Sequence, residues 1–166
     1  MAERRRVFVA AGSNVEPRVH LRRALLALRG LYPDIEVSPA YANPAVGFEG
    51  DDFVNVVVGF TTDESLESLI EHLRGVETLC GRPRAAPKWA PRSMDLDILL
   101  VGDVAGSFPG VVLPRPDLLR RAFMLGPLAD LAPGLVHPTA GRTIGELWRA
   151  FDAAGHVLRP VSLDEP

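Results

Sequence analysis

Near the middle of the chain the sequence reads Phe53-Val54-Asn55-Val56-Val57-Val58-Gly59-Phe60-Thr61. Valine, phenylalanine and threonine are enriched in β-strands because their side chains fit a pleated, half-buried surface. We therefore predict one long strand over residues 53–61. The fold then depends on the segments that precede and follow this strand.

The segments before it predict a strand, a helix and a second short strand. Residues 7–11 are a short apolar run that stops at turn residues, which is typical of a buried strand. Residues 17–30 carry an apolar face at helical spacing, formed by Leu21, Ala24, Leu25 and Leu28. Asn14 is the expected cap of this helix, Pro17 suits its first turn and Gly30 ends it. Residues 35–38 alternate like a half-buried strand, whereas residues 43–52 form a loop of a length that is often functional.

The segments after it complete a regular order of elements. A second helix has an apolar stripe of Leu66, Leu69, Ile70, Leu73, Val76 and Cys80, and Gly81 stops it. Residues 94–101 predict the last strand of the order β-α-β-β-α-β. This order indicates an α+β, ferredoxin-like fold, an antiparallel sheet with two helices on one face. A helical, turn-rich C-terminal part follows, with short helices over residues 123–131 and 143–151.

Composition limits the classes of function. With 166 residues, 47% of them hydrophobic, the chain has the size of a single domain, which we expect to span residues 1–166. A formal net charge of -3 argues against binding nucleic acid or anionic lipid through the overall field. The only cysteine, Cys80, cannot form an internal disulfide, and no apolar run approaches the length of a membrane span. We expect a soluble, cytoplasmic monomer that binds neither nucleic acid nor membrane.

Asp95 and Asp97 are the first candidates for chemistry. In a strand they share one face, while Leu96, Ile98 and Leu100 take the other. Their Cβ atoms would lie about 6 to 7 Å apart, a spacing that can serve two cations. Magnesium is typically held by one or two carboxylates together with water and substrate phosphate. For an isolated Asp-x-Asp, a solvated strand edge is the more common interpretation.

The preceding loop, residues 82–92, favours a metal site. Three prolines stiffen a segment that carries Trp89 and four cations, Arg82, Arg84, Lys88 and Arg92. Guanidinium groups beside two metal-binding carboxylates are suited to a polyphosphate, because arginine makes bidentate contacts to phosphate. An exposed basic loop paired with acidic surface remains the alternative.

Three further residues are weaker clues. Glu77 lies on the stripe that should face the sheet, so its carboxylate needs a partner. A salt bridge to an arginine such as Arg82 and a supporting role beside the metal site are both open. Phe53 and Asn55 share a strand face and offer a stacking ring and an amide for a heterocycle edge. A core phenylalanine and a strand-edge asparagine are the default interpretation of that pair.

Together these residues resemble the 6-hydroxymethyl-7,8-dihydropterin pyrophosphokinase family of folate biosynthesis. Residues 89–100, Trp-Ala-Pro-Arg-Ser-Met-Asp-Leu-Asp-Ile-Leu-Leu, are similar to the family's Trp-Gly-Pro-Arg-Thr-Leu-Asp-Leu-Asp-Ile stretch. The likeness runs from about Val7 to about Trp148, and supporting matches keep the family's order. They are Gly12-Ser13-Asn14, Tyr41 with Pro44 and Gly47, Phe53-Val54-Asn55, Glu77 with Gly81-Arg82, and Arg121-Ala122-Phe123-Met124-Leu125.

The resemblance implies an enzyme that transfers the terminal pyrophosphoryl unit of ATP to the hydroxymethyl oxygen of the pterin and leaves AMP. Asp95 and Asp97 would bind two Mg2+, and Arg82 and Arg92 would support the transferring unit. The implied ATP site comprises Glu77, Arg84, Lys88, Trp89, Ile98, Arg115 and Arg121. Phe53 and Phe123 would sandwich the pterin, Asn55 would bind its edge, and a loop with Asn43, Pro44, Val46 and Gly47 would close over it.

Three segments depart from the family pattern. Asn43-Pro44-Ala45 stands where Thr-Pro-Pro is common, and Ala90 replaces a glycine. Arg115 stands where a histidine commonly follows the proline, and arginine can meet phosphate but cannot act as a base. None of the three removes a metal ligand.

Two other classes of function fit the predicted fold. A ferredoxin-like domain can sense nucleotides or bind RNA on its sheet. A nucleotidyltransferase of the polymerase-palm kind also places carboxylates on such a sheet, but it releases pyrophosphate rather than AMP.

Overall fold

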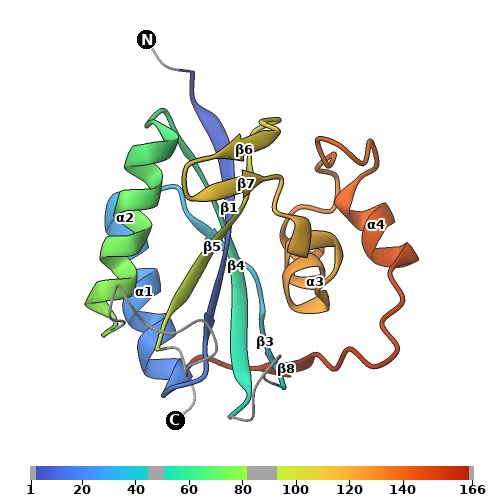
Figure 1. Cartoon of the computed structure of the whole chain (residues 1–166). Coiled ribbons are helices and arrows are strands. Elements are labelled where there is room, and N and C mark those ends of the chain that lie inside the picture. Colours follow the sequence, from blue (N-terminus) through green and yellow to red (C-terminus); the bar gives the residue numbers. More distant parts are fainter. Residues whose placement is uncertain (1–2, 45–50, 82–92, 165–166) are drawn as a thin grey trace.

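A six-stranded antiparallel sheet forms the middle layer of the protein (Figure 1). The computed structural model describes residues 3–44, 51–81 and 93–164. Along the sheet the strands follow the order β5-β1-β4-β3-β8, and the short β2 also pairs with β4. Their bounds are β1 Arg5–Ser13, β2 Glu36–Val37, β3 Ala40–Asn43, β4 Phe53–Thr62, β5 Asp95–Val101 and β8 Arg159–Val161.

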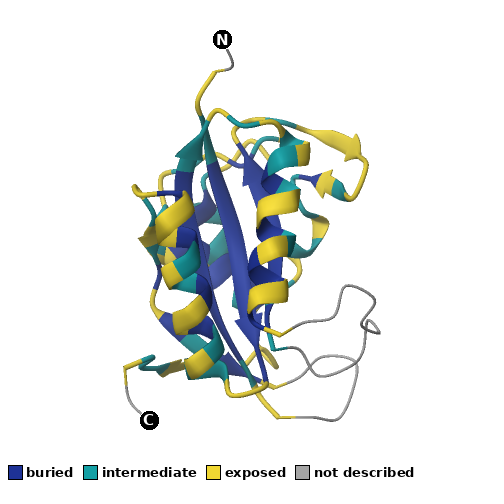
Figure 2. Cartoon of the chain, turned by 90° about the vertical axis from the view of Figure 1, so that its left-hand side faces the viewer, coloured by how far each residue is buried: buried dark blue, intermediate teal, exposed yellow. Residues whose placement is uncertain are grey.

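The paired strands β1 and β4 form the centre of the sheet. Their register is unbroken from Arg5 opposite Thr62 to Ser13 opposite Val54. Seven of the ten residues of β4 are buried, and Figure 2 shows the strands as the most buried part of the molecule. A strand covered on both faces favours a continuous apolar run over strict alternation, which accounts for the valines of residues 53–61.

Helices cover both faces of the sheet (Figure 1). On the first face lie α1 (Pro17–Leu31) and α2 (Leu66–Leu79), which enclose one apolar core with alternate residues of β1. On the second face lie η1 (Pro116–Leu119), α3 (Ala122–Leu131) and α4 (Ile144–Ala150), whose core includes Phe8 and Ala10. The predicted ferredoxin-like α+β fold is confirmed, and the C-terminal part covers the face that the first two helices leave open.

The second strand of the predicted order is interrupted. Residues 35–38 were expected to form it, but only Glu36–Val37 pair as β2, and pairing resumes at Ala40 as β3. Pro39 lies between them and has no N–H to donate. The Ser38 hydroxyl oxygen accepts the Val57 N–H at 2.8 Å, so this backbone donor of β4 has a partner where the neighbouring strand is interrupted. As a result Asn43, expected in a loop, ends a strand.

The C-terminal part contains more strand than its sequence predicts. A hairpin of β6 (Gly106–Phe108) and β7 (Val111–Leu113) follows β5, and β8 pairs with β3 at the edge of the main sheet. Each of these strands has three residues, which is too short for an alternating pattern to identify. The two short helices are confirmed, and α4 begins with a capping box between Thr143 and Glu146.

The start of α1 differs from the prediction. Glu16 occupies the cap position with a positive φ of 41° and makes no side-chain cap bond. Asn14, the predicted cap, instead donates from its amide to the Asp51 carbonyl oxygen at 3.3 Å. The helix also continues one residue past Gly30. None of the helices in the described residues has the length and apolar character of a membrane span.

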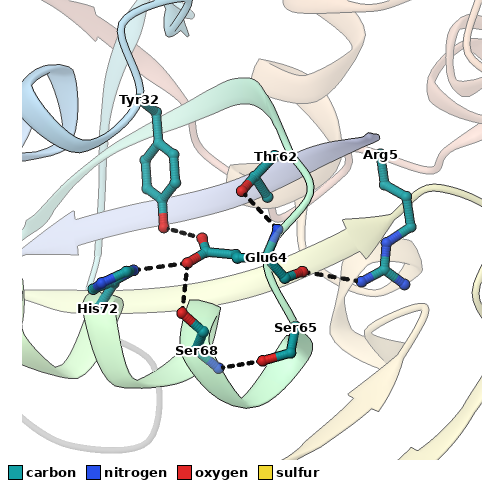
Figure 3. Close-up of polar contacts among 7 residues, drawn as sticks. All are labelled: Arg5, Tyr32, Thr62, Glu64, Ser65, Ser68 and His72. Atoms are coloured by element: carbon teal, nitrogen blue, oxygen red, sulfur yellow. Dashed lines mark hydrogen bonds and ion pairs between the residues drawn. The ribbon is translucent and has the colours of Figure 1, made fainter. Parts of the chain in front are cut away.

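Glu64 joins the two helices of the first face (Figure 3). Its carboxylate accepts hydrogen bonds from the hydroxyls of Tyr32, at the end of α1, and Ser68, in α2, and lies 2.8 Å from His72 Nδ1. Burial alone would raise the pKa of the Glu64 carboxyl, but these partners hold it below its usual value. Glu64 follows the end of β4 that pairs with Arg5, so this cluster lies at the opposite end of β1 from Asp95.

Candidate active site

Asp95 and Asp97 lie at the start of β5 on the second face of the sheet. Asp95 is opposite Gly12 of β1, and Asp97 is opposite Ala10, which belongs to the core under α3. Leu96 and Ile98 are buried on the other face, against α1 and α2. The predicted shared face of the two carboxylates is therefore confirmed.

A β-bulge changes the face of the next residues. Phe8 is opposite Leu100 and Val9 is opposite Ile98, so Leu99 is the extra residue of β5. The expectation that Leu100 shares a face with Leu96 was wrong, because the bulge turns Leu100 into the second core. The bulged Leu99 carbonyl oxygen accepts the Arg115 N–H at 2.9 Å. Bulges often re-aim side chains next to active sites, and this one brings Arg115 beside Asp97.

The charges around Asp97 oppose one another. Its side chain is only 21% exposed, and this burial, with the neighbouring Asp95 charge, raises the pKa of Asp97 to about 7. The Arg115 guanidinium acts in the other direction, with Nη2 3.6 Å from Asp97 Oδ1 and 3.7 Å from Asp117 Oδ2. A divalent cation at this position would relieve the repulsion between the two carboxylates.

The carboxylates of Asp95 and Asp97 suit magnesium better than a metal whose ligands all come from protein side chains. In the part of the chain that the structure describes, no group of three or more His, Cys, Asp and Glu side chains could hold a metal ion. Magnesium, however, commonly takes one or two carboxylates and completes its shell with water and substrate phosphate. Asp95 and Asp97 fit that requirement.

Glu77 supports the edge of β5 between the two aspartates. It is only 4% exposed, and its Oε2 accepts the Leu96 N–H at 2.8 Å. Its Oε1 lies 2.9 Å from Arg74 Nη1, and the same guanidinium lies 3.4 Å from the Leu96 carbonyl oxygen. Among the described strands β5 is the last on this side, so the two side chains take the place of a neighbouring strand. The expected salt bridge is present, with Arg74 as the partner, and the supporting role of Glu77 beside a metal site stays a prediction.

Arg74 is a residue that the sequence interpretation missed. It stands three residues before Glu77 in α2, a spacing at which helical side chains are neighbours. That spacing, together with the need of a buried carboxylate for a cation, was the available signal. Glu77 was expected to pair with an arginine such as Arg82, which lies outside the described residues.

A pocket at the free side of β5 brings three predicted site residues together. Asp97, Ile98 and Arg115 line it, and the remaining lining residues are Ile70, Leu73, Arg74, Leu96, Gly110 and Val111. Gly110 and Val111 belong to the turn and second strand of the β6–β7 hairpin, so the hairpin that the sequence did not predict forms one wall. The pocket joins an apolar lining to the charged side chains of Asp97 and Arg115.

The predicted pterin residues gather on the same face, nearer the other edge. Asn55 donates from Nδ2 to Asn43 Oδ1, and both side chains are buried. Phe53 lies two residues before Asn55 on β4, on the same face, and is opposite Asn43 of β3. Phe123 lies in the first turn of α3 and packs against the second core. Arg121 precedes this helix as its cap residue, and Pro44 follows β3.

Several predicted site residues lie outside the described part of the chain. They are Val46, Gly47, Arg82, Arg84, Lys88, Trp89 and Arg92. Ala45 and Ala90, two of the departures from the family pattern, also lie outside the described residues. Their roles stay predictions.

Comparison with known proteins identifies the family. Residues 8–133 match the family described as 7,8-dihydro-6-hydroxymethylpterin-pyrophosphokinase (HPPK). The chain belongs to the HPPK family. Among its HPPK relatives is the 2-amino-4-hydroxy-6-hydroxymethyldihydropteridine pyrophosphokinase of Pseudomonas aeruginosa, 40% identical over 90% of this chain and 94% of that protein. The protein of the same name from Synechocystis is 33% identical over 87% of this chain and 75% of that protein.

Solved structures agree on the HPPK fold. A Plasmodium falciparum HPPK-DHPS with pteroate has a TM-score of 0.71 and 13% identity, covering 91% of this chain. This chain spans 43% of that longer chain, and at this identity the likeness concerns the fold alone. The family resemblance predicted from the sequence is confirmed, and the chain is a pyrophosphokinase.

Proposed function

We propose that this enzyme transfers the terminal pyrophosphoryl unit of ATP to the hydroxymethyl oxygen of 6-hydroxymethyl-7,8-dihydropterin on the second face of its sheet, and releases AMP. The observation that carries the proposal is the placement of the Asp95–Asp97 pair and the Asn43–Asn55 pair on that one face. Family membership supports the activity in folate biosynthesis. Such a transfer needs positioning and charge stabilisation more than covalent chemistry from the protein.

Asp95 and Asp97 would hold two magnesium ions. Bound magnesium would offset the phosphate charge and orient the pyrophosphoryl unit. The protein prepares this position by keeping both carboxylates on one strand face and by holding the strand between them with Glu77. In this proposal Glu77 contributes to ATP binding through β5.

The ATP site would extend from these carboxylates into the pocket beside β5. Ile98 supplies an apolar wall, and the Arg115 guanidinium, 3.6 Å from Asp97, is within reach of a phosphate bound there. Arginine binds phosphate in a bidentate way, so Arg115 can replace the family's common histidine in this role. Arg121, Arg84, Lys88 and Trp89 would complete the nucleotide site, and Arg82 and Arg92 would support the transition state.

The pterin site would lie toward β3 and α3. Phe53 and Phe123 come from the two layers that meet on this face and would stack on the flat ring. The Asn55 amide would bind the edge of the ring, and the segment with Asn43, Pro44, Val46 and Gly47 would close over it. Asn43 already orients Asn55 by a hydrogen bond.

We further propose that residues 1–166 act as one domain, as a monomer in the cytoplasm, without nucleic acid or membrane partners. The net charge of -3 and the single cysteine support this proposal.

The test is product analysis with the purified protein, ATP, Mg2+ and 6-hydroxymethyl-7,8-dihydropterin. We expect AMP and the pterin pyrophosphate in equal amounts, and no AMP when the pterin is left out. Release of inorganic pyrophosphate instead of AMP would indicate nucleotidyl transfer, and no product from either substrate would contradict the proposal.

A further inference from the structure

Gly12 separates the two halves of the site. In β1 it lies opposite Asn55 of β4 on one side and opposite Asp95 of β5 on the other. Directly opposite residues of antiparallel strands project their side chains to the same face. Neighbouring strands are about 4.8 Å apart, so the amide and the carboxylate arise about 10 Å apart with a residue that has no side chain between them.

The backbone does not require glycine at position 12. Gly12 is not among the glycines with a positive φ, so an alanine could adopt its conformation without strain. The requirement is space. A Cβ atom on Gly12 would lie 2.5 Å from Asn55 Oδ1, 3.6 Å from Asn55 Cγ and 3.7 Å from Phe53 Cδ1. The Asn55 side chain therefore occupies the volume that any other residue at position 12 would fill.

A short relay of hydrogen bonds fixes which end of the Asn55 amide points to Gly12. The Pro44 carbonyl oxygen can only accept, so the group of Asn43 that meets it at 3.0 Å is the donor Nδ2. Asn43 Oδ1 is then left to accept from Asn55 Nδ2. Asn55 therefore presents its carbonyl oxygen over Gly12, on the side toward Asp95.

We propose that Gly12 is a positioning residue for the transfer reaction, because its missing side chain lets the Asn55 carbonyl oxygen lie across β1 between the pterin and the metal site. This inference rests on the proposed function, which places the pterin at Asn55 and the ATP phosphates at Asp95. A donor on the edge of the pterin ring meets the Asn55 oxygen above Gly12, which holds the ring in register with the Asp95 side of the sheet. A side chain at position 12 displaces that oxygen from its place above the strand.

The chain offers a glycine control. A Cβ on Gly30, an exposed residue near the end of α1, meets no atom within 4 Å, so Gly30→Ala tests the loss of glycine without a contact. Gly59 is also crowded, but by the ring of Phe8 in the core, so a substitution there reports on packing instead.

The experiment compares wild type, Gly12→Ala, Asn55→Ser, the double variant and Gly30→Ala. For each protein we measure thermal unfolding, the affinity for a magnesium complex of a non-hydrolysable ATP analogue, and the affinity for 6-hydroxymethyl-7,8-dihydropterin in the presence of that complex. We expect Gly12→Ala to weaken pterin binding about tenfold and analogue binding less than about twofold. In the Asn55→Ser background the same substitution should change pterin affinity less than about twofold, because the displaced oxygen is absent. Gly30→Ala should match wild type in its affinity for both ligands.

Three results would overturn the role of Gly12. They are an unchanged pterin affinity in Gly12→Ala, an equal loss of both ligands, and the same loss with and without the Asn55 side chain. Should Gly12→Ala fail to fold, the double variant must fold and bind the analogue, because the contact that prevents folding has been removed; its failure to fold also contradicts the inference. A wild-type protein that makes no AMP contradicts the proposed function, whereas an active wild type with an unaffected Gly12→Ala contradicts only the inference.

Discussion

At Asp97, burial and the Asp95 charge both disfavour the ionised carboxylate, and together they raise its pKa to about 7. Such a carboxylate costs stability in the metal-free protein, and a bound cation would remove that cost. Functional sites often keep a charged group in surroundings that disfavour its charge, and the protein then loses stability in return for activity.

The first prediction concerns Asp97→Asn in the presence of a chelator. The folded-state pKa lies above the usual value of 3.8, so the folded protein retains a proton between about pH 4 and pH 7 that the unfolded chain releases. The free energy of unfolding of the wild type should therefore fall as pH rises from about 4 to about 7, and it should remain at this lower value at pH 8. We expect the variant to be more stable than wild type at pH 8, by on the order of 1 kcal/mol, and similar to it near pH 4.

Urea unfolding at both pH values measures this difference, and turnover with Mg2+ and ATP should fall at least about a hundredfold in the same variant. The exposed Asp103→Asn, in the turn after β5, is the control and should leave stability and turnover unchanged. A metal-free Asp97→Asn protein less stable than wild type at pH 8 would show that the Asp97 carboxylate stabilises the fold.

At the scale of elements, the sequence predicts the helices and strands that carry a long, periodic apolar pattern. The apolar stripes of α1 and α2 and the valines of β4 were sufficient to derive the order of elements, because each pattern extends over several turns or pairs. The interruption at Pro39, the bulge at Leu99 and the three-residue strands leave no such pattern, since their geometry depends on partners far away in the sequence. Asp95 and Asp97 were recognisable from the spacing of a strand, whereas the Leu96 N–H that Glu77 accepts lies 19 residues away in the sequence and leaves no pattern.

A second prediction concerns the edge of β5. Glu77→Ala leaves the Leu96 N–H without its carboxylate and Arg74 without its buried partner. We expect a loss of about 2 kcal/mol in the free energy of unfolding and a weaker affinity for the magnesium–ATP-analogue complex, because the two aspartates flank Leu96. Chemical denaturation and titration with the analogue measure both. Glu67→Ala, exposed in the first turn of the same helix, is the matched control, and equal effects of the two variants would refute the role of Glu77.

A third prediction concerns the Glu64 cluster at the opposite end of the sheet. The pKa of the Glu64 carboxyl is held below its usual value despite its burial, so its contribution to stability is present above about pH 4.5 and is lost as pH falls through the folded-state pKa. We expect Glu64→Gln to cost about 1–2 kcal/mol at pH 7 and clearly less at pH 3. Urea unfolding at the two pH values measures this, with Glu67→Gln in α2 as control. A cost that does not depend on pH would mean that packing, and not charge, connects the two helices.

At the scale of the whole molecule, the segment after α4 returns to the edge of the sheet near the proposed pterin residues. After α4, β8 returns to the sheet and pairs with β3, the strand that ends in Asn43 (Figure 1). Arg159 lies 3.7 Å from Asp52, and the Ser162 carbonyl oxygen accepts a hydrogen bond from Arg18 Nε at 2.8 Å. These contacts connect the C-terminal segment to the residue before β4 and to the first turn of α1.

A fourth prediction is that removal of residues 159–166 weakens pterin binding at least about fivefold and leaves the affinity for the ATP analogue within about twofold. The deletion removes the partner of β3 on one side, while β4 still pairs on the other, and so exposes a strand edge; we therefore also expect a greater tendency to aggregate. Binding titrations and light scattering measure the two effects, and Arg159→Ala alone should produce a smaller loss of pterin affinity. Equal losses for both ligands would show that β8 supports the sheet as a whole.

The central claim is that one face of this sheet transfers a pyrophosphoryl unit from ATP to the pterin, and the most direct measurement follows the β-phosphorus. With ATP labelled at the β-phosphate, Mg2+ and 6-hydroxymethyl-7,8-dihydropterin, we predict that the label moves to the pterin product and that the AMP formed is unlabelled. Label that stays with the nucleotide while the γ-phosphate moves would mean transfer of a single phosphoryl group and would contradict the claim.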